Sequence, residues 1–291
     1  MPSRLTWSLI LALGAPIGLS AQQAPPSTDI WLIRWGGKAS DARNLTDRPG
    51  YDNQPSFSPD GRWVLYSSER NGQTEIYRSD LAQRVTVPLT ATAESEYSPQ
   101  VMPDGLAFSV VRVEADSSQR LWAFSMNGQT AVPLLADTKP VGYHAWADST
   151  TVVLYVLGNP STLQVADVRK GTAEIVTGRI GRSLKKVPGV RAVSFVDQSD
   201  STRWVIRNLD LAPRSMAEVA PTLPGREDFA WRAPGSLLMA SGTVLYEWNR
   251  GKARWDSRQD FAALGFTSIT RLAVSPDGRW IALVADRPAS P

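Results

Sequence analysis

Short apolar stretches, separated by turns rich in Gly, Pro and Asp, recur along the chain. The hexapeptide Ser-Pro-Asp-Gly-Arg-Trp occupies residues 58–63 and again residues 275–280. Each copy follows an apolar residue and precedes a strand-like run, at residues 64–66 and 281–283. The pattern predicts a repeated unit in which a strand, a Pro-Asp-Gly turn and a second strand follow one another.

Weaker copies of the unit lie between these two, which gives six units in all. An apolar or aromatic anchor precedes the turn in each unit, and successive anchors are 36 to 49 residues apart. The anchors are Phe57, Val101, Trp146, Phe195, Trp231 and Val274. A spacing of about 40–50 residues is typical of β-propeller blades.

A third strand with alternating apolar residues follows in most units, for example at residues 75–81 and 162–167. The last unit ends after its second strand, whereas residues 29–35 and 44–46 resemble a third and a fourth strand that precede the first unit. We therefore predict an all-β fold, a six-bladed β-propeller with four-stranded antiparallel blades. N-terminal strands would complete the C-terminal blade and close the ring, which removes open sheet edges. An open array of six units is the alternative.

Residues 55–68, followed by Gly72, Ile76 and Tyr77, resemble the repeat of TolB-type six-bladed β-propellers. The resemblance is strongest in the first and sixth units. It implies the propeller scaffold. Members of that family also have an α/β domain before the propeller, and the residues that precede the first expected strand are too few for one. The resemblance is therefore to the propeller repeats only.

The first residues have the pattern of a secretion signal. Arg4 precedes an apolar core at residues 7–13, and Ser20 and Ala21 offer a small-residue cleavage site. We expect a signal peptide at residues 1–21, a linker at 22–28 and the propeller domain at 29–291. A membrane anchor is the alternative, but the apolar stretch is shorter than the ~20 residues that a spanning helix needs. The expected location is periplasmic or secreted, with no membrane insertion after cleavage.

Composition limits the chemistry. The chain has no cysteine and a single histidine, which excludes disulfides, thiolate metal sites and multi-histidine metal sites. Asp60, Asp104 and Asp277 are expected to bond to their own turns. We expect no metal, no cofactor and no catalytic residue. The net charge of +3 does not indicate nucleic-acid binding. A basic stretch at residues 179–191 is expected to be a solvated inter-blade loop rather than an anion site.

Loops that lead from the outermost strand of one blade to the innermost strand of the next should line one mouth of the ring. A Tyr recurs in these loops, shortly before each of the first three anchors. Tyr and Arg side chains rimmed by carboxylates suit contacts with a protein or peptide. The candidate partner-binding residues are Tyr51, Asp52, Glu96, Tyr97, Tyr143, His144, Arg191 and Asp228.

The sequence favours an exported, non-enzymatic propeller, expected to be a monomer, that binds an envelope or secreted protein at one mouth of the ring. The alternative is a small-molecule or glycan binding protein, or a hydrolase, that uses the central channel with His144 as its polar anchor. A third hypothesis is a degenerate propeller with a purely structural role in the envelope.

Overall fold

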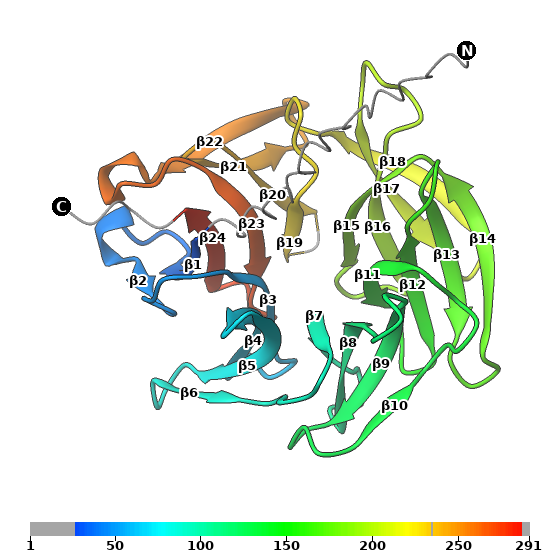
Figure 1. The fold of residues 1–291 in the computed structure, drawn as a ribbon. Helices are drawn as coiled ribbons and strands as arrows, with labels where there is room; N and C mark the ends of the chain where they lie inside the picture. Colours follow the sequence, from blue (N-terminus) through cyan, green and yellow to red (C-terminus); the bar gives the residue numbers. More distant parts are fainter. Residues whose placement is uncertain (1–26, 234, 287–291) are drawn as a thin grey trace, which may run out of the picture.

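Each repeat folds into a four-stranded antiparallel sheet, and six such sheets surround a central axis (Figure 1). The structure, a computed structural model, describes residues 27–233 and 235–286. The predicted six-bladed propeller is confirmed. The signal peptide predicted at residues 1–21 lies outside the described residues. Within the described ranges, no helix is long and apolar enough to cross a membrane.

Every blade is an antiparallel meander, and its inner strand faces the axis. Blades one to three, from the inner to the outer strand, are β3 (Asp52–Phe57), β4 (Trp63–Arg70), β5 (Gln73–Asp80) and β6 (Val85–Pro88); β7 (Ser95–Val101), β8 (Ala107–Val113), β9 (Gln119–Ser125) and β10 (Ala131–Pro133); and β11 (Val141–Trp146), β12 (Thr151–Val156), β13 (Thr162–Asp167) and β14 (Thr172–Gly178). Blades four and five are β15 (Ile180–Lys186), β16 (Ala192–Asp197), β17 (Val205–Asp210) and β18 (Ser215–Pro221); and β19 (Phe229–Ala233), β20 (Ser236–Ser241), β21 (Val244–Asn249) and β22 (Arg254–Asp260).

Blade six joins the two ends of the described chain. Its strand order is β23 (Ile269–Val274), β24 (Trp280–Asp286), β1 (Thr28–Arg34) and β2 (Arg43–Asn44). Strand β1 pairs with β24 along its whole length, from Thr28 opposite Asp286 to Arg34 opposite Trp280. The predicted closure by N-terminal strands is therefore confirmed. The closure covers the edge of β24 that would otherwise be open.

The two copies of the repeated hexapeptide form the same hydrogen-bonded turn. The Ser58 hydroxyl donates to Asp60 Oδ1 at 2.6 Å, and the same oxygen accepts the backbone N–H of Arg62 at 3.1 Å. Ser275 and Asp277 repeat the side-chain bond at 2.5 Å. These carboxylates bond to their own turns, as expected, because the short Asp side chain reaches the backbone two residues further on.

The fourth blade begins one strand earlier than the repeat spacing predicted. Phe195 lies in the second strand, β16, and the inner strand is β15. The first five residues of β16 are all buried, whereas β15 contains three basic residues. The search for an apolar anchor therefore selected the buried second strand, because the inner strand of this blade lines a polar channel.

Apolar side chains pack between neighbouring blades. One cluster combines Leu65 and Ile76 of blade one with Phe108 and Phe124 of blade two, and all four are fully buried. The two Phe rings stack with their centroids 5.4 Å apart. Burying such a side chain contributes about 1.5–3 kcal/mol. These inter-blade clusters therefore hold the inner strands in place around the axis.

Candidate functional site

The axis of the ring holds a cavity of about 250 Å³, which we call the channel cavity. All six inner strands contribute residues to its wall. Because each blade begins with its inner strand, these strands run in the same direction along the axis. The end where they begin is called the tyrosine end, after Tyr51, Tyr97 and Tyr143, and the end where they finish is called the turn end.

Bulges in the inner strands direct side chains into the channel. The register of β3 against β4, and of β7 against β8, shifts around Gln54 and Ser98. These two residues have φ values of +56° and +54°, because a bulge bends the strand and re-aims its side chains. Gln54 Oε1 accepts hydrogen bonds of 2.8 Å from the Ser98 backbone N–H and from the Ser67 hydroxyl. The Gln54 side chain is therefore fixed between blades one and two.

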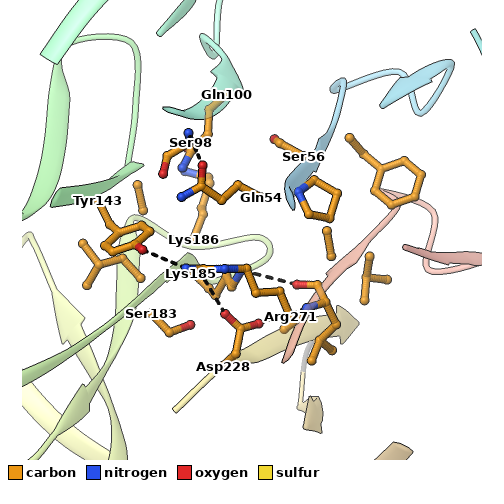
Figure 2. A pocket seen from close by; sticks show the side chains of 18 of the residues that line it. Gln54, Ser56, Ser98, Gln100, Tyr143, Ser183, Lys185, Lys186, Asp228 and Arg271 are labelled. Atoms are coloured by element: carbon orange, nitrogen blue, oxygen red, sulfur yellow. Dashed lines mark hydrogen bonds and ion pairs between the residues drawn. The ribbon is translucent and has the colours of Figure 1, made fainter. Parts of the chain in front are cut away.

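Two basic side chains and one carboxylate meet inside the channel (Figure 2). Lys185 Nζ, from β15, donates to the carbonyl oxygen of Leu272 at 3.5 Å. Arg271 Nη1, from β23, lies 3.7 Å from Asp228 Oδ2. Desolvation lowers the pKa of Lys185; the Asp228 carboxylate opposes this shift and the Arg271 charge adds to it. The channel wall is thus electropositive at this level.

The basic stretch was expected to be a solvated loop, and for its central residues this expectation is wrong. Arg182, Lys185 and Lys186 lie in the inner strand β15 and line the channel cavity. Arg182 Nη1 pairs with Glu227 Oε1 at 3.3 Å. Sequence reasoning missed these residues because it placed the fourth blade one strand too late. Assigning the basic stretch to the inner strand of the fourth blade would have predicted that these residues line the channel.

Three tyrosines lie together at the tyrosine end. Tyr51, Tyr97 and Tyr143 are half-buried and line a hollow of about 340 Å³, which we call the tyrosine hollow. The Tyr143 hydroxyl accepts a hydrogen bond of 2.7 Å from Arg271 Nη2. Desolvation raises the pKa of Tyr51 to about 12, so its hydroxyl stays protonated near neutral pH and can donate or accept hydrogen bonds.

Two candidate carboxylates face the protein interior. Asp52 and Glu96 are both 0% exposed. Asp52 Oδ2 pairs with Arg48 Nη1, and Glu96 Oε1 with Arg112 Nε, each at 2.9 Å. Desolvation raises the pKa of both carboxyls, that of Glu96 to about 8. These side chains support the tyrosine end from within, and a partner would not reach them directly.

The single histidine is a buried link between blades two and three. His144 is 2% exposed, and its Nε2 lies 2.7 Å from the Ser109 hydroxyl, which accepts a 2.8 Å bond from Trp146 Nε1. The indole can only donate, so the Ser109 hydroxyl can give its proton either to His144 Nε2 at 2.7 Å or to the Gln100 carbonyl at 3.4 Å. Desolvation lowers the pKa of His144 to about 3. Ser109 is 0% exposed, whereas His144 is among the residues that line the channel cavity.

The two remaining candidates lie at different ends of the ring. Asp228 immediately precedes β19, near the tyrosine end. Arg191 follows β15 at the turn end, where its Nε pairs with Asp148 Oδ2 at 2.6 Å. Arg191 is therefore separated from the other candidates, and its assignment to the same mouth is wrong because it depended on the misaligned fourth blade.

The polar groups of the channel are suited to binding through hydrogen bonds and charge. Lys185 and Arg271 supply N–H donors, and Asp228 supplies an acceptor. Among residues 27–233 and 235–286, no group of three or more His, Asp or Glu side chains is arranged to hold a metal ion.

The chain is similar in sequence to a known protein family and to individual proteins of that family. The family model described as "TolB beta propeller domain" matches residues 17–190. The Tol-Pal system protein TolB of Bordetella pertussis is 39% identical over 54 residues, which are 19% of this chain. That match spans only 12% of the relative's own length.

Solved structures extend the likeness over most of the chain. The structure described as putative TolB from Agrobacterium tumefaciens has a TM-score of 0.71 at 15% identity, and the alignment covers 91% of this chain and all of that one. An oligogalacturonate lyase in complex with manganese has a TM-score of 0.59 at 13% identity and covers 85% of this chain and 80% of its own. At such low sequence identities, these two likenesses show a common fold and nothing further. Because the family model spans more than half of the sequence, the chain belongs to the TolB beta propeller domain family.

Proposed function

We propose that this chain is a non-enzymatic binding protein that holds a protein partner at the tyrosine end of the ring. The observation that carries the proposal is the tyrosine hollow, which Tyr51, Tyr97 and Tyr143 line together. Tyr combines a large apolar ring with a hydrogen-bonding hydroxyl, and it is enriched among the residues that dominate binding at protein interfaces. Each Tyr lies at or in a different inner strand, so the ring presents all three at fixed positions.

The rest of the hollow suits the same kind of ligand. Val111, Val113 and Leu157 also line it, and Leu157 is 40% exposed. Val111 is 2% exposed and lies at the base of the hollow. The hollow therefore combines aromatic and aliphatic side chains with hydrogen-bonding hydroxyls, and protein interfaces likewise combine apolar and polar groups.

The partner is proposed to be an exported protein. This rests on the signal-like residues 1–21, which favour a periplasmic or secreted product. A relative that is named as a Tol-Pal system protein supports a role beside other proteins. We further propose that the propeller acts as a monomer, because the pairing of β1 with β24 closes the ring and only the inner and outer strands of the blades remain as sheet edges.

The second candidate function is the binding or hydrolysis of a small molecule or glycan in the channel cavity. The basic residues in that cavity and the fold shared with a lyase favour it. His144, the expected polar anchor, argues against hydrolysis because it is 2% exposed and has a pKa of about 3. A general base works best when its pKa lies near the operating pH.

The test is a capture experiment from a cell-envelope extract. The purified protein is compared with a variant in which Tyr51, Tyr97 and Tyr143 are changed to Ala, and with Tyr246→Ala as a half-buried tyrosine in blade five. We expect a partner that the wild type and Tyr246→Ala retain and that the triple variant loses at least about tenfold. Circular dichroism confirms that each variant folds. Equal capture by the triple variant would contradict the proposal.

A further inference from the structure

Lys185 carries a charge that its surroundings leave without a counter-ion. Within the described chain, no carboxylate lies at ion-pair distance from Nζ, and the ammonium makes one hydrogen bond, the 3.5 Å contact with the Leu272 carbonyl. An ammonium has three N–H donors. A half-buried cation with unused donors is unfavourable unless an anion or water completes its coordination.

The nearby charges do not balance this cation. Asp228 Oδ1 accepts the backbone N–H of Leu272 at 3.0 Å, and Asp228 Oδ2 faces Arg271 at 3.7 Å. Arg182 is neutralised by its own pair with Glu227. Two cations, Lys185 and Arg271, therefore share one carboxylate, and these three groups have an excess of one positive charge. Lys186, which also lines the cavity, donates to the Ala147 carbonyl and adds to this excess.

Neutral donors surround the same space. The hydroxyls of Ser98 and Ser183 are buried, have no hydrogen-bond partner among the described residues and belong to residues that line the channel cavity. Ser183 precedes Lys185 by two positions on β15, and Figure 2 shows Ser183, Lys185 and Arg271 around one space with Asp228 at its edge. Cationic N–H groups together with hydroxyls are the donors that bind carboxylate and phosphate oxygens.

We propose that the channel cavity binds an oxyanion, a carboxylate or phosphate group, between Lys185 and Arg271. The anion would supply the counter-charge that the described part of the chain does not provide, and it would accept hydrogen bonds from the ammonium and the serine hydroxyls. The cavity of about 250 Å³ is smaller than the ~300–1,000 Å³ of typical ligand pockets. It therefore fits one small acid or a single acidic group of a larger molecule.

The oxyanion has two sources with the same chemistry. It is either a free small anion or an acidic side chain of the partner at the tyrosine end. Gln54 and Tyr143 line both the channel cavity and the tyrosine hollow, so a bound partner is close enough to insert such a group. In that second case the inference rests on the proposed function.

The test is an NMR titration that follows the backbone amide signals of Ser183 and Leu272. Inorganic phosphate and succinate are added separately to the wild-type protein, and chloride at matched ionic strength is the control. We expect saturable shifts with phosphate or succinate and none with chloride. Lys185→Gln should weaken the affinity at least about tenfold, whereas Lys185→Arg, which keeps the charge, should remain within a few-fold of wild type.

Lys170→Gln is the matched control for the loss of one positive charge. The Lys170 side chain is 76% exposed and pairs with Asp167 outside the channel, so this variant should bind as the wild type does. Equal responses to chloride and phosphate, or an unchanged affinity in Lys185→Gln, would overturn the proposal. If Lys185→Gln does not fold, the wild-type titration and Lys185→Arg still decide the outcome.

The two sources are separated by repeating the envelope capture with added phosphate. If the partner supplies the oxyanion, saturating phosphate and Lys185→Gln should both reduce capture. If capture is unchanged while phosphate occupies the channel, the ligand is a free small anion. A failure of the proposed function would be seen in the capture experiment alone. The triple tyrosine variant would then capture the same proteins as the wild type, and the result of the phosphate titration would not change.

Discussion

Arg271 donates a hydrogen bond of 2.7 Å from Nη2 to the hydroxyl of Tyr143, 128 positions away in the sequence. The two residues belong to blades six and three, which face each other across the ring. The guanidinium carbon also lies 5.0 Å from the centre of the Tyr143 ring. Because Tyr143 lines both the tyrosine hollow and the channel cavity, this contact lies at the boundary between the two spaces.

The Arg271–Tyr143 bond should stabilise the ring measurably. Tyr143→Phe removes the hydroxyl, and the mostly buried N–H of Arg271 then has no acceptor at this position. We expect the free energy of unfolding to fall by about 1 kcal/mol, measured by urea denaturation. Tyr246→Phe is the control, because the Tyr246 hydroxyl has no hydrogen bond within the described part of the chain, and its effect should be within about 0.5 kcal/mol of zero. Equal losses in both variants would show that the bond contributes nothing.

The single histidine provides a direct test of the buried contact between blades two and three. With a pKa of about 3 in the folded state, His144 binds fewer protons than the unfolded chain does between about pH 6.5 and pH 3. Its contribution to stability therefore falls as the pH decreases through that range. The C2–H signal of His144 should stay constant from pH 8 to pH 4 in the folded protein. In urea the same signal should titrate near pH 6.5, and a native titration near that value would mean that the imidazole is open to solvent.

The buried carboxyl group of Glu96 should give the opposite pH dependence. Desolvation, followed by the contact with Glu75, raises the pKa of Glu96 to about 8. Within the described residues, no donor reaches Glu96 Oε2, which is buried, and this favours the neutral form of the Glu96 carboxyl. The folded protein then binds more protons than the unfolded chain between about pH 4.5 and pH 8. Stability is therefore lost as the pH rises through this window.

Glu96→Gln should remove that pH dependence. The amide oxygen can still accept from Arg112, and the amide N–H₂ replaces the carboxyl proton of Glu96 as a donor to Glu75. We expect the variant to be at least as stable as the wild type at pH 8.5, measured by denaturant unfolding across the pH range. Glu94→Gln is the control, because Glu94 lies at the edge of the same group, with Oε2 3.9 Å from Arg112 Nη1. A wild-type slope that survives in Glu96→Gln would assign the dependence to another group.

Gly128 marks a close approach between blades one and two. A Cβ at this position would overlap the carbonyl group of Leu89, whereas a Cβ at Gly105 would meet nothing within 4 Å. The two glycines have nearly the same φ, +74° and +73°. The backbone strain of Ala in this left-handed conformation should therefore cost about 1 kcal/mol of stability at both positions. We expect Gly128→Ala to lose about 1–3 kcal/mol more than Gly105→Ala. Thermal or urea denaturation of the pair measures this difference, and equal losses would mean that the blades adjust freely.

The candidate site was only partly predictable. Tyr51, Tyr97 and Tyr143 could be expected to meet because they precede equivalent inner strands of a closed ring. Lys185 and Arg271 could not be identified, because a charged residue in the sequence looks the same on a solvated loop and on a channel wall. Their meaning depends on burial and on opposing strands, which appear only when the ring closes.

The sequence by itself determined the blade turns, the number of blades and the closure. The Ser58–Asp60 and Ser275–Asp277 bonds join residues two positions apart, so a short peptide already encodes them, and the regular spacing of such turns counts the blades. Tertiary structure alone decided that β15 is the inner strand of blade four and that Arg271 meets Tyr143. Channel-facing strands need not carry an apolar pattern, and contacts across the ring arise from geometry that no local stretch of sequence contains.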